Sequence, residues 1–324
     1  MNEPSDIGRR LHRIRRARGK SLAAIAGLSG ISRGHLSRLE HGERAIDRRS
    51  LVVALATALA VAPQDLTALP VPAPGNGGTD AAVHAVRVTL LAVDLHRPDG
   101  SVVPVQALRS QLDTVREVRG AGRFAEVGVV LPGLIRDLYA SIDAGRDVAE
   151  LLTLAVDLHV HITLGWLRDA GAPLDLRCQA AMAACHAARD RDEPHALGTA
   201  YYGAANALLS SSAFDLARAE LDSVPALSVT GDTVPLVGML AMTSALVAAA
   251  DNRHGDVSAP MKLAAELAEH TGEPSDPEPF GFGPTNVGLW QMALALESGE
   301  PDRAVSIAER VDPRRHPFAT RRCA

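Results

Sequence analysis

The chain has 324 residues and a net charge of −5, and this length is sufficient for two domains. Aromatic residues make up only 3% of it, which argues against a β-sandwich or a large enzyme core. The abundance of Ala, Leu and Arg favours helices, because these residues lose little free energy on entering one. No uninterrupted apolar run approaches the roughly 20 residues that cross a bilayer, and the N-terminus lacks a signal-peptide core. We therefore expect a cytoplasmic helical protein with no membrane partner.

The charge is divided unevenly along the chain. Residues 1–70 hold 12 Lys and Arg against 6 Asp and Glu, a net charge of +6, whereas the remainder carries −11. A basic head joined to an acidic body is typical of a nucleic-acid-binding module fused to a part that does not bind nucleic acid. The charge pattern therefore predicts a nucleic-acid partner for the first 70 residues.

Residues 21–42 predict two short helices joined by a tight turn. Ser21 can cap the first helix and Ser32 the second. Gly30 lies at the corner, where a residue without a Cβ lets the chain turn sharply. Apolar residues at helical spacing predict the buried face of each helix. They are Leu22, Ile25 and Ala26 in the first helix, and Leu36 and Leu39 in the second.

The outer face of the second helix then carries Arg33, Gly34, Ser37 and Arg38. Its N-terminal dipole is positive, its side chains are hydrogen-bond donors for base edges, and its glycine permits close approach of DNA. This helix is predicted to enter a major groove and read bases.

Residues 7–69 resemble the five-helix Cro/repressor-type helix-turn-helix domain of the XRE family, which places a DNA-binding domain at 1–69. The run from Ser32 to Gly42 carries the resemblance. Helix one is expected at Ile7–Arg18 with Asp6 as its cap, the fourth at Arg48–Ala60 after Asp47, and a fifth after Pro63. Two residues depart from the pattern: Leu22 replaces a frequent Gln that contacts phosphate, and Ser29 replaces an apolar residue.

The resemblance implies double-stranded DNA as the partner, with an inverted-repeat operator bound by a homodimer. It implies base contacts from the four outer residues of the second motif helix. It also implies phosphate contacts from basic residues near the motif, for which the candidates are Arg16, Arg18, Arg44 and Arg48.

Residues 70–79 are predicted to be a linker, because Pro70–Pro74 favours extended chain and Gly75–Gly78 favours free rotation. The head is therefore not expected to dock rigidly on the body.

Residues 80–324 predict helices paired in hairpins. Second helices begin near residues 173, 213, 257 and 301, and this regular spacing is typical of an α-solenoid. The segment Val86–Leu95 is rich in β-branched residues, yet we interpret it as a helix that ends before Pro98. The expected hairpins are Ala149–Ala170 with Leu174–Asp190, Pro194–Ser211 with Ala213–Val224, Val234–Asp251 with Val257–Glu269, and Asn286–Leu296 with Pro301–Val311.

Three segments share one turn-plus-helix design, beginning at Ala121, Ser212 and Ser298. They resemble the second half of tetratricopeptide (TPR) repeats, although the 34-residue period is absent. The expected fold is therefore all-α, with a helix-turn-helix head and a TPR-like α-solenoid. The chain ends without the closing hairpin usual in such bodies, so we expect either a second subunit over that face or a shortened form.

A head and body of these kinds resemble bacterial transcriptional regulators, including the peptide-sensing RRNPP group, whose solenoid binds a peptide or small molecule on its concave face. Candidate ligand contacts are Tyr202 with Asn206, and Asn286 with Trp290, each pair four residues apart on one helix face. The alternative is that these residues are ordinary inter-repeat packing. The long connection Glu273–Asn286 is expected to fold over the groove.

No catalytic motif is present, so we expect no enzyme and no cofactor. Cys178 and Cys185 are too far apart along a helix for a disulfide and are expected to be core thiols. Asp157 and His161 can pair, but no third convergent ligand makes a metal site, and His159 and His161 are expected to be surface or satisfied side chains. The second functional hypothesis is an adaptor whose solenoid binds a partner protein, such as a toxin or a polymerase subunit, with the head as DNA anchor.

Overall fold

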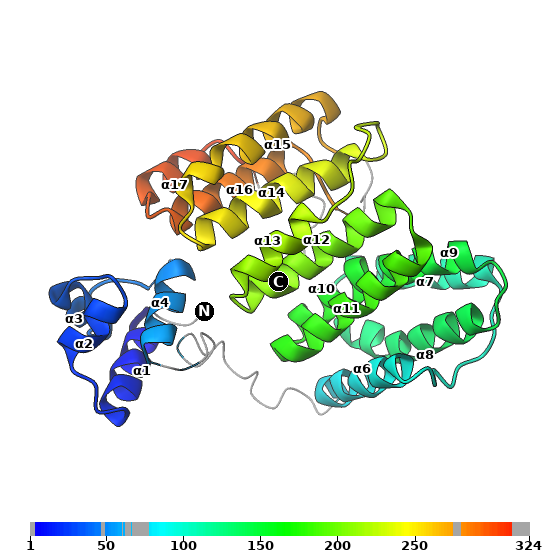
Figure 1. The fold of residues 1–324 in the computed structure, drawn as a ribbon, viewed down its shortest axis with the longest axis horizontal. Coiled ribbons are helices and arrows are strands. Elements are labelled where there is room, and N and C mark those ends of the chain that lie inside the picture. The colour runs from blue at the N-terminus through cyan, green and yellow to red at the C-terminus, as the bar shows by residue number, and fades with distance from the viewer. Residues whose placement is uncertain are drawn as a thin grey trace.

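The computed structural model describes residues 4–46, 49–59, 61, 66, 78–274 and 280–312. Within these ranges the chain is entirely helical, with no strand. The fold is therefore all-α, as predicted, and it comprises an N-terminal head of four described helices followed by a larger helical body (Figure 1).

The head contains α1 (Pro4–Ala17), α2 (Leu22–Leu28), α3 (Arg33–Glu40) and α4 (Arg49–Leu59). Its core is a small apolar cluster whose innermost side chains are fully buried: Leu11, Ile25, Leu36, Leu39 and Leu55. The predicted spacing of apolar residues in the two motif helices is thus confirmed for Ile25, Leu36 and Leu39. Of the predicted fifth helix only Leu66 is described, and it is helical and buried in the core of the head; the Asp47 cap and Arg48 lie outside the described residues.

The first helix corrects one prediction. It begins at Pro4 and includes Asp6, which was expected to be its cap, and it ends at Ala17 instead of Arg18. Proline suits a helical first turn, because the N–H that it lacks would have no intrahelical acceptor there.

The body begins at α6, which also corrects the linker boundary: α6 starts at Gly78, so the last two residues of the predicted linker are helical. Residues 67–77 lie outside the described part of the chain. The segment 86–94 is helical, as predicted. The helices of the body are α6 (Gly78–Asp94), α7 (Val105–Gly120), α8 (Phe124–Asp143), α9 (Val148–Asp157), η1 (Leu158–Thr163), α10 (Leu164–Asp169), α11 (Leu174–Arg191), α12 (Pro194–Ser210), α13 (Phe214–Asp222), α14 (Val234–Ala250), η2 (His254–Asp256), α15 (Ser258–Thr271), α16 (Pro284–Glu297) and α17 (Pro301–Ala308).

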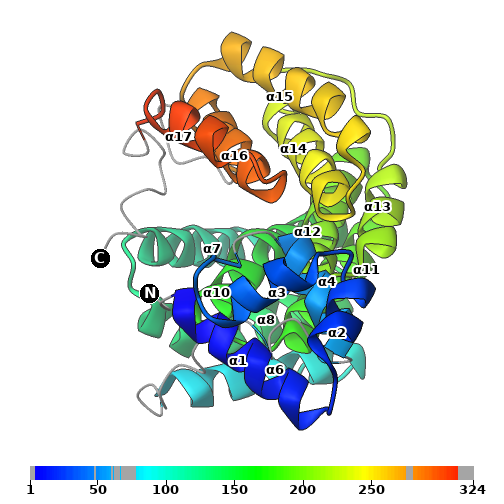
Figure 2. The ribbon, with the colours of Figure 1, turned by 90° about the vertical axis from the view of Figure 1, so that its left-hand side faces the viewer.

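Most body helices pack on their neighbours in sequence, as in α11–α12 and α14–α15, and several also pack on the next helix but one, as in α6–α8, α12–α14 and α14–α16. Figure 2 shows α6 and α8 at one end of the body and α16 and α17 at the other, with α12 and α13 between them. All four predicted helix hairpins are present, with ends shifted by a few residues; the last helix stops at Ala308 instead of Val311. The TPR-like assignment itself stays a prediction.

The three turn-plus-helix segments are also present. Gly122, Ser212 and Gly299 have φ values of 75°, 61° and 73°, and α8, α13 and α17 begin two residues after them. A left-handed residue at the end of a helix reverses the chain direction within a short turn, which lets the next helix pack back on the previous one.

The predicted helix 149–170 is interrupted. Leu158–Thr163 forms a π-helical turn between α9 and α10, and the hydroxyl of Thr163 donates to the carbonyl of Leu158 at 3.1 Å. The carbonyl of His161 accepts from Arg119 Nη1 at 2.7 Å, so an arginine of α7 satisfies a backbone group in this turn. A single π-helical turn leaves the spacing of apolar residues almost unchanged, so the interruption could not be predicted from sequence periodicity.

This interrupted helix, Val148–Asp169, is also long and apolar enough to cross a membrane by length and composition, with 22 residues and a mean hydropathy of 1.4. However, 61% of its most apolar window is buried inside the body, where it packs against α8 and α11. It is therefore a core helix of the body.

Candidate nucleic-acid interface

The turn between α2 and α3 has the local geometry that the sequence predicts. The Ser21 hydroxyl accepts a hydrogen bond from the Ala24 N–H, and the Ser32 hydroxyl accepts one from the His35 N–H, both at 3.1 Å. Gly30 has a φ of 67°, which an L-residue with a Cβ rarely adopts. The caps begin both helices at fixed residues, so the register of α3 against the core is set locally.

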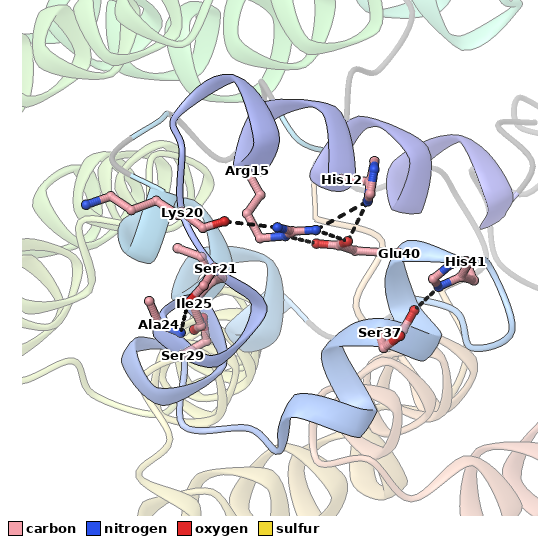
Figure 3. Close-up of polar contacts among 10 residues, drawn as sticks. All are labelled: His12, Arg15, Lys20, Ser21, Ala24, Ile25, Ser29, Ser37, Glu40 and His41. Carbon is pink, nitrogen blue, oxygen red and sulfur yellow. Dashed lines mark hydrogen bonds and ion pairs between the residues drawn. The ribbon is translucent and has the colours of Figure 1, made fainter.

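A buried ion-pair cluster fixes α3 to α1 (Figure 3). Arg15 donates from Nε and Nη2 to the two carboxylate oxygens of Glu40, at 2.5 and 2.8 Å, and from Nη1 to the Lys20 carbonyl at 2.9 Å. His12 Nδ1 lies 2.7 Å from Glu40 Oε2. Only 7% of the Arg15 side chain and 1% of the Glu40 side chain are exposed. The bidentate geometry therefore fixes the angle between the two helices.

The cluster keeps Glu40 charged. Burial alone pushes the pKa of Glu40 upward, but hydrogen bonds from Arg15 and His12 outweigh burial, and the resulting pKa lies below the ordinary value. The hydrogen bond to Glu40 also raises the pKa of Arg15. This cluster was not predicted from the sequence, although a signal exists: Glu40 lies four residues after Leu36, on the apolar face of α3.

Gly8 brings the two helices into close contact. A Cβ at this position would overlap the backbone carbonyl oxygen of Leu39, which belongs to α3. Because the obstructing atom is backbone, it cannot move aside as a side chain would. The position of α3 therefore depends on Gly8 as well as on the Arg15–Glu40 pair.

The predicted base-reading residues lie on α3 as expected. Arg33, Gly34 and Arg38 are exposed, and Ser37 is half-buried. A Cβ at Gly34 would meet no atom within 4 Å, so the fold does not require a glycine there. Arg38 Nε donates to the Gly34 carbonyl at 3.3 Å, so in this structure its side chain lies along the helix surface. The fold leaves this face of α3 open.

Three of the predicted phosphate-contacting residues are also exposed. Arg16 lies in the last turn of α1 and Arg18 directly follows that helix, close in sequence to the start of α2. Arg44 follows α3, and its backbone N–H donates to the Arg38 carbonyl at 3.3 Å, which keeps it beside the end of α3. The fourth, Arg48, lies outside the described residues.

The predicted ligand contacts of the body lie on α12 and α16, on either side of α14. Asn206 donates to the Tyr202 carbonyl at 2.9 Å and to the Thr243 hydroxyl at 3.5 Å. Asn286, which is 5% exposed, donates to the Gly281 carbonyl at 3.1 Å and lies 3.5 Å from Met239 Sδ. Met239 and Thr243 are four residues apart on α14, so both Asn amides contact the same face of that helix. They bind groups of the protein itself.

The two aromatic residues among the predicted ligand contacts, Tyr202 and Trp290, take part in packing. Tyr202 lies edge-on to Phe280 with ring centroids 5.4 Å apart, and Trp290 packs against the apolar cluster of α14–α16. A recess of about 300 Å³ lies between α15, α16 and α17 beside Glu269, Gln291 and Arg310, and none of the four predicted residues lines it. These contacts agree with the packing interpretation; ligand binding at the four residues stays a prediction.

The histidines of the π-helical turn are interior residues, so of the two placements expected from the sequence, at the surface or satisfied inside the protein, the surface is excluded. His159 is fully buried and lies 3.0 Å from the Tyr139 hydroxyl, while His161 lies edge-on to Phe280 at 4.7 Å. Burial lowers the pKa of His159 to about 4 and that of His161 to about 3, so both rings are neutral near pH 7. In the described part of the chain, no group of three or more His, Cys, Asp or Glu could hold a metal ion.

The thiols of Cys178 and Cys185 are free, and Cys185 is buried, as predicted for a core thiol. Burial raises the pKa of Cys185 to about 12, which leaves it protonated and unreactive.

Comparison with known families agrees with the geometry of the head. A family model described as a helix-turn-helix domain matches residues 6–69. No curated protein and no solved structure matches the chain. Residues 6–69 are therefore a helix-turn-helix domain, the class of module that binds DNA, and the body has no counterpart in these comparisons.

Proposed function

We propose that this protein is a sequence-specific DNA-binding transcriptional regulator of the XRE type, acting in the cytoplasm and without enzymatic activity. The observation that carries the proposal is the outer face of α3. Arg33, Gly34 and Arg38 are exposed there on a helix whose angle and register are fixed by buried contacts, and the fold does not require a glycine at position 34. Fixed donors on a rigid helix are what base reading in a major groove needs.

Selection of bound genomic fragments by the full chain tests this function. We expect enrichment of inverted repeats whose half-sites lie about one helical turn, or about 34 Å, apart, because a head of this size makes few base contacts alone. We therefore propose a homodimer on an inverted-repeat operator. Recovery of random fragments only, from repeated selections, would contradict sequence reading.

The proposed role of the body is to sense a peptide or small molecule near Tyr202, Asn206, Asn286 and Trp290. Because Asn206 and Asn286 both contact α14, a ligand that takes over either hydrogen bond would shift α12 or α16 against α14. Binding changes DNA affinity only if the ligand prefers one arrangement of the helices over the other.

Tryptophan fluorescence tests this site. Trp166 is 2% exposed and donates to the Phe124 carbonyl, whereas Trp290 is half-buried next to the proposed site. We expect an effector from cell extract to change the emission of a Trp166→Phe variant. Unchanged emission, together with unchanged effector affinity in Asn206→Ala and Asn286→Ala, would place the site elsewhere.

The second candidate function is a DNA-anchored adaptor whose body binds a partner protein. The absence of a match for the body leaves this candidate in place beside the sensor. Affinity capture with the full chain separates them: an adaptor yields a stoichiometric protein complex and no thermal shift with small molecules, whereas a sensor yields the thermal shift.

A further inference from the structure

One face of α6 presents an apolar stripe to the outside of the body. Val88, Leu91 and Leu95 are 50%, 48% and 70% exposed. Leu95 continues the helical geometry, since its N–H donates to the Leu91 carbonyl at 3.1 Å. With Ala81 and His84, which are both exposed, the stripe follows alternating steps of three and four residues over the length of the helix.

The fold of the single chain does not use this stripe. The opposite face of α6 is buried through Val86, Leu90 and Val93. Polar contacts with α11 also hold the helix in place: Arg87 pairs with Asp175 at 3.0 Å, and Gln179 donates to Asp94 at 2.9 Å. In Figure 1, α6 lies along the lower edge of the body, where no described helix covers it on the outer side.

The spacing of the stripe is that of a helix-pairing seam. Apolar residues that alternate by three and four stay on one side of a helix over several turns and pack against a second helix. Singly scattered apolar side chains are normal on a surface, but three large ones in line on one helix mark an interaction surface.

We propose that α6 pairs in antiparallel orientation with α6 of a second copy of this chain, so that the stripe of Val88, Leu91 and Leu95 becomes the core of a twofold dimer interface. This proposal rests on the homodimer of the proposed function and names its surface. In a twofold interface the same patch is used by both copies, so a single stripe is sufficient for closure.

The charges at the two ends of α6 favour a second copy in this orientation. Asp80 is exposed in the first turn, and Arg97 is exposed just beyond the last, held there by a hydrogen bond from its N–H to the Ala92 carbonyl at 2.8 Å. Neither side chain has an ion-pair partner among the described residues. Antiparallel pairing places Asp80 of each copy near Arg97 of the other, whereas parallel pairing places like charges together.

The orientation also suits the heads. An α6 of 17 residues is about 25 Å long, so antiparallel pairing separates the two N-termini, from which the heads extend, by about that distance. Parallel pairing would bring the two N-termini within about 10 Å. Half-sites about 34 Å apart are reached more directly from the antiparallel arrangement.

The test is the oligomeric state of the full chain without DNA, measured by sedimentation velocity over a concentration series. We expect a dimer whose dissociation constant rises more than about tenfold in Leu91→Glu and in Leu95→Glu. Val305→Glu is the matched control, because Val305 is 59% exposed on α17 and lies outside the stripe; its dissociation constant should stay that of the wild type. Circular dichroism confirms that each variant is folded.

Charge reversal tests the orientation. Asp80→Arg and Arg97→Asp should each weaken the dimer, and the double variant should restore it, because the exchanged charges again attract. A double variant weaker than both single ones would overturn the antiparallel arrangement. A dimer that both Leu variants leave intact overturns the surface but not the homodimer, whereas a monomeric wild type overturns both. Binding of a single head to DNA is measured separately and does not depend on which surface forms the dimer.

Discussion

Arg33 and Arg38 lie on the exposed face of α3, whereas Arg44 lies in the loop that follows it. Contacts to base edges distinguish one sequence from another, and contacts to phosphate do not. We predict that Arg33→Ala and Arg38→Ala each cost about 1–3 kcal/mol on the specific site and little on random DNA, while Arg44→Ala weakens binding to both equally. Fluorescence anisotropy with the two DNAs measures this. Equal losses of affinity for both DNAs in Arg33→Ala would indicate that Arg33 contacts phosphate and not a base.

Glu40 joins α1 and α3 through charges that are both buried. Removing one partner of such a pair leaves the other charged and unpaired, which costs about 3–5 kcal/mol. We predict this loss in the free energy of unfolding of the head for Glu40→Ala, measured by urea denaturation. Glu43→Ala is the control: Glu43 is exposed and outside the cluster, so its effect should stay within about 0.5 kcal/mol.

The same cluster predicts the acid sensitivity of the head. Because the pKa of Glu40 is lower when folded, its stabilisation is complete above the ordinary glutamate pKa of about 4.3 and is lost as the pH falls through the lower folded value. The free energy of unfolding should therefore fall more steeply with acidification in the wild type than in Glu40→Gln. Parallel curves for the two proteins below about pH 4 would contradict this assignment.

Two glycines of the head, Gly8 in α1 and Gly34 in α3, have different surroundings. Gly8 faces the backbone of α3, whereas Gly34 faces open space on the outer side of α3. We predict that Gly8→Ala destabilises the head by about 1–3 kcal/mol, because α1 must move away from α3. Gly34→Ala should raise stability by up to about 1 kcal/mol through helix propensity and still weaken DNA binding. Thermal melts measure the stability of both variants, and fluorescence anisotropy measures their DNA affinity. Unchanged DNA affinity in Gly34→Ala would contradict a close approach of DNA at that residue.

At the level of elements, local signals explain what the sequence predicts well. Ser21, Ser32 and Gly30 act on atoms a few residues away, so their pattern is enough to place α2, α3 and the turn between them. The hairpins of the body follow in the same way from glycine turns and apolar periodicity. The interruption at Leu158–Thr163 was not predictable, because it involves Arg119, which is 42 residues from the carbonyl that it satisfies.

Long-range packing also limited the prediction of the sites. Arg15 and Glu40 are 25 residues apart and meet only when α1 crosses α3. Asn206 and Asn286 share a helix face with an aromatic residue, as the sequence indicates, but their partners on α14 are set by the stacking of helices. Helix periodicity places a side chain on a face; it does not show which neighbour that face meets.

For the whole molecule, the proposed dimer sets the stoichiometry on DNA. A single head buries little DNA surface, and a twofold protein on an inverted repeat doubles the number of contacts. We predict two chains per saturated operator by native mass spectrometry. One chain per operator would contradict the homodimer but not the proposal that the head binds DNA.

Sequence discrimination by the head can be measured as the ratio of two dissociation constants of the full chain, one for a shuffled duplex and one for its selected site, both at one near-physiological salt concentration. We predict a ratio of about 10³ or more, and a ratio reduced by about tenfold or more in the Arg33→Ala Arg38→Ala double variant. A wild-type ratio near one would contradict base reading by α3.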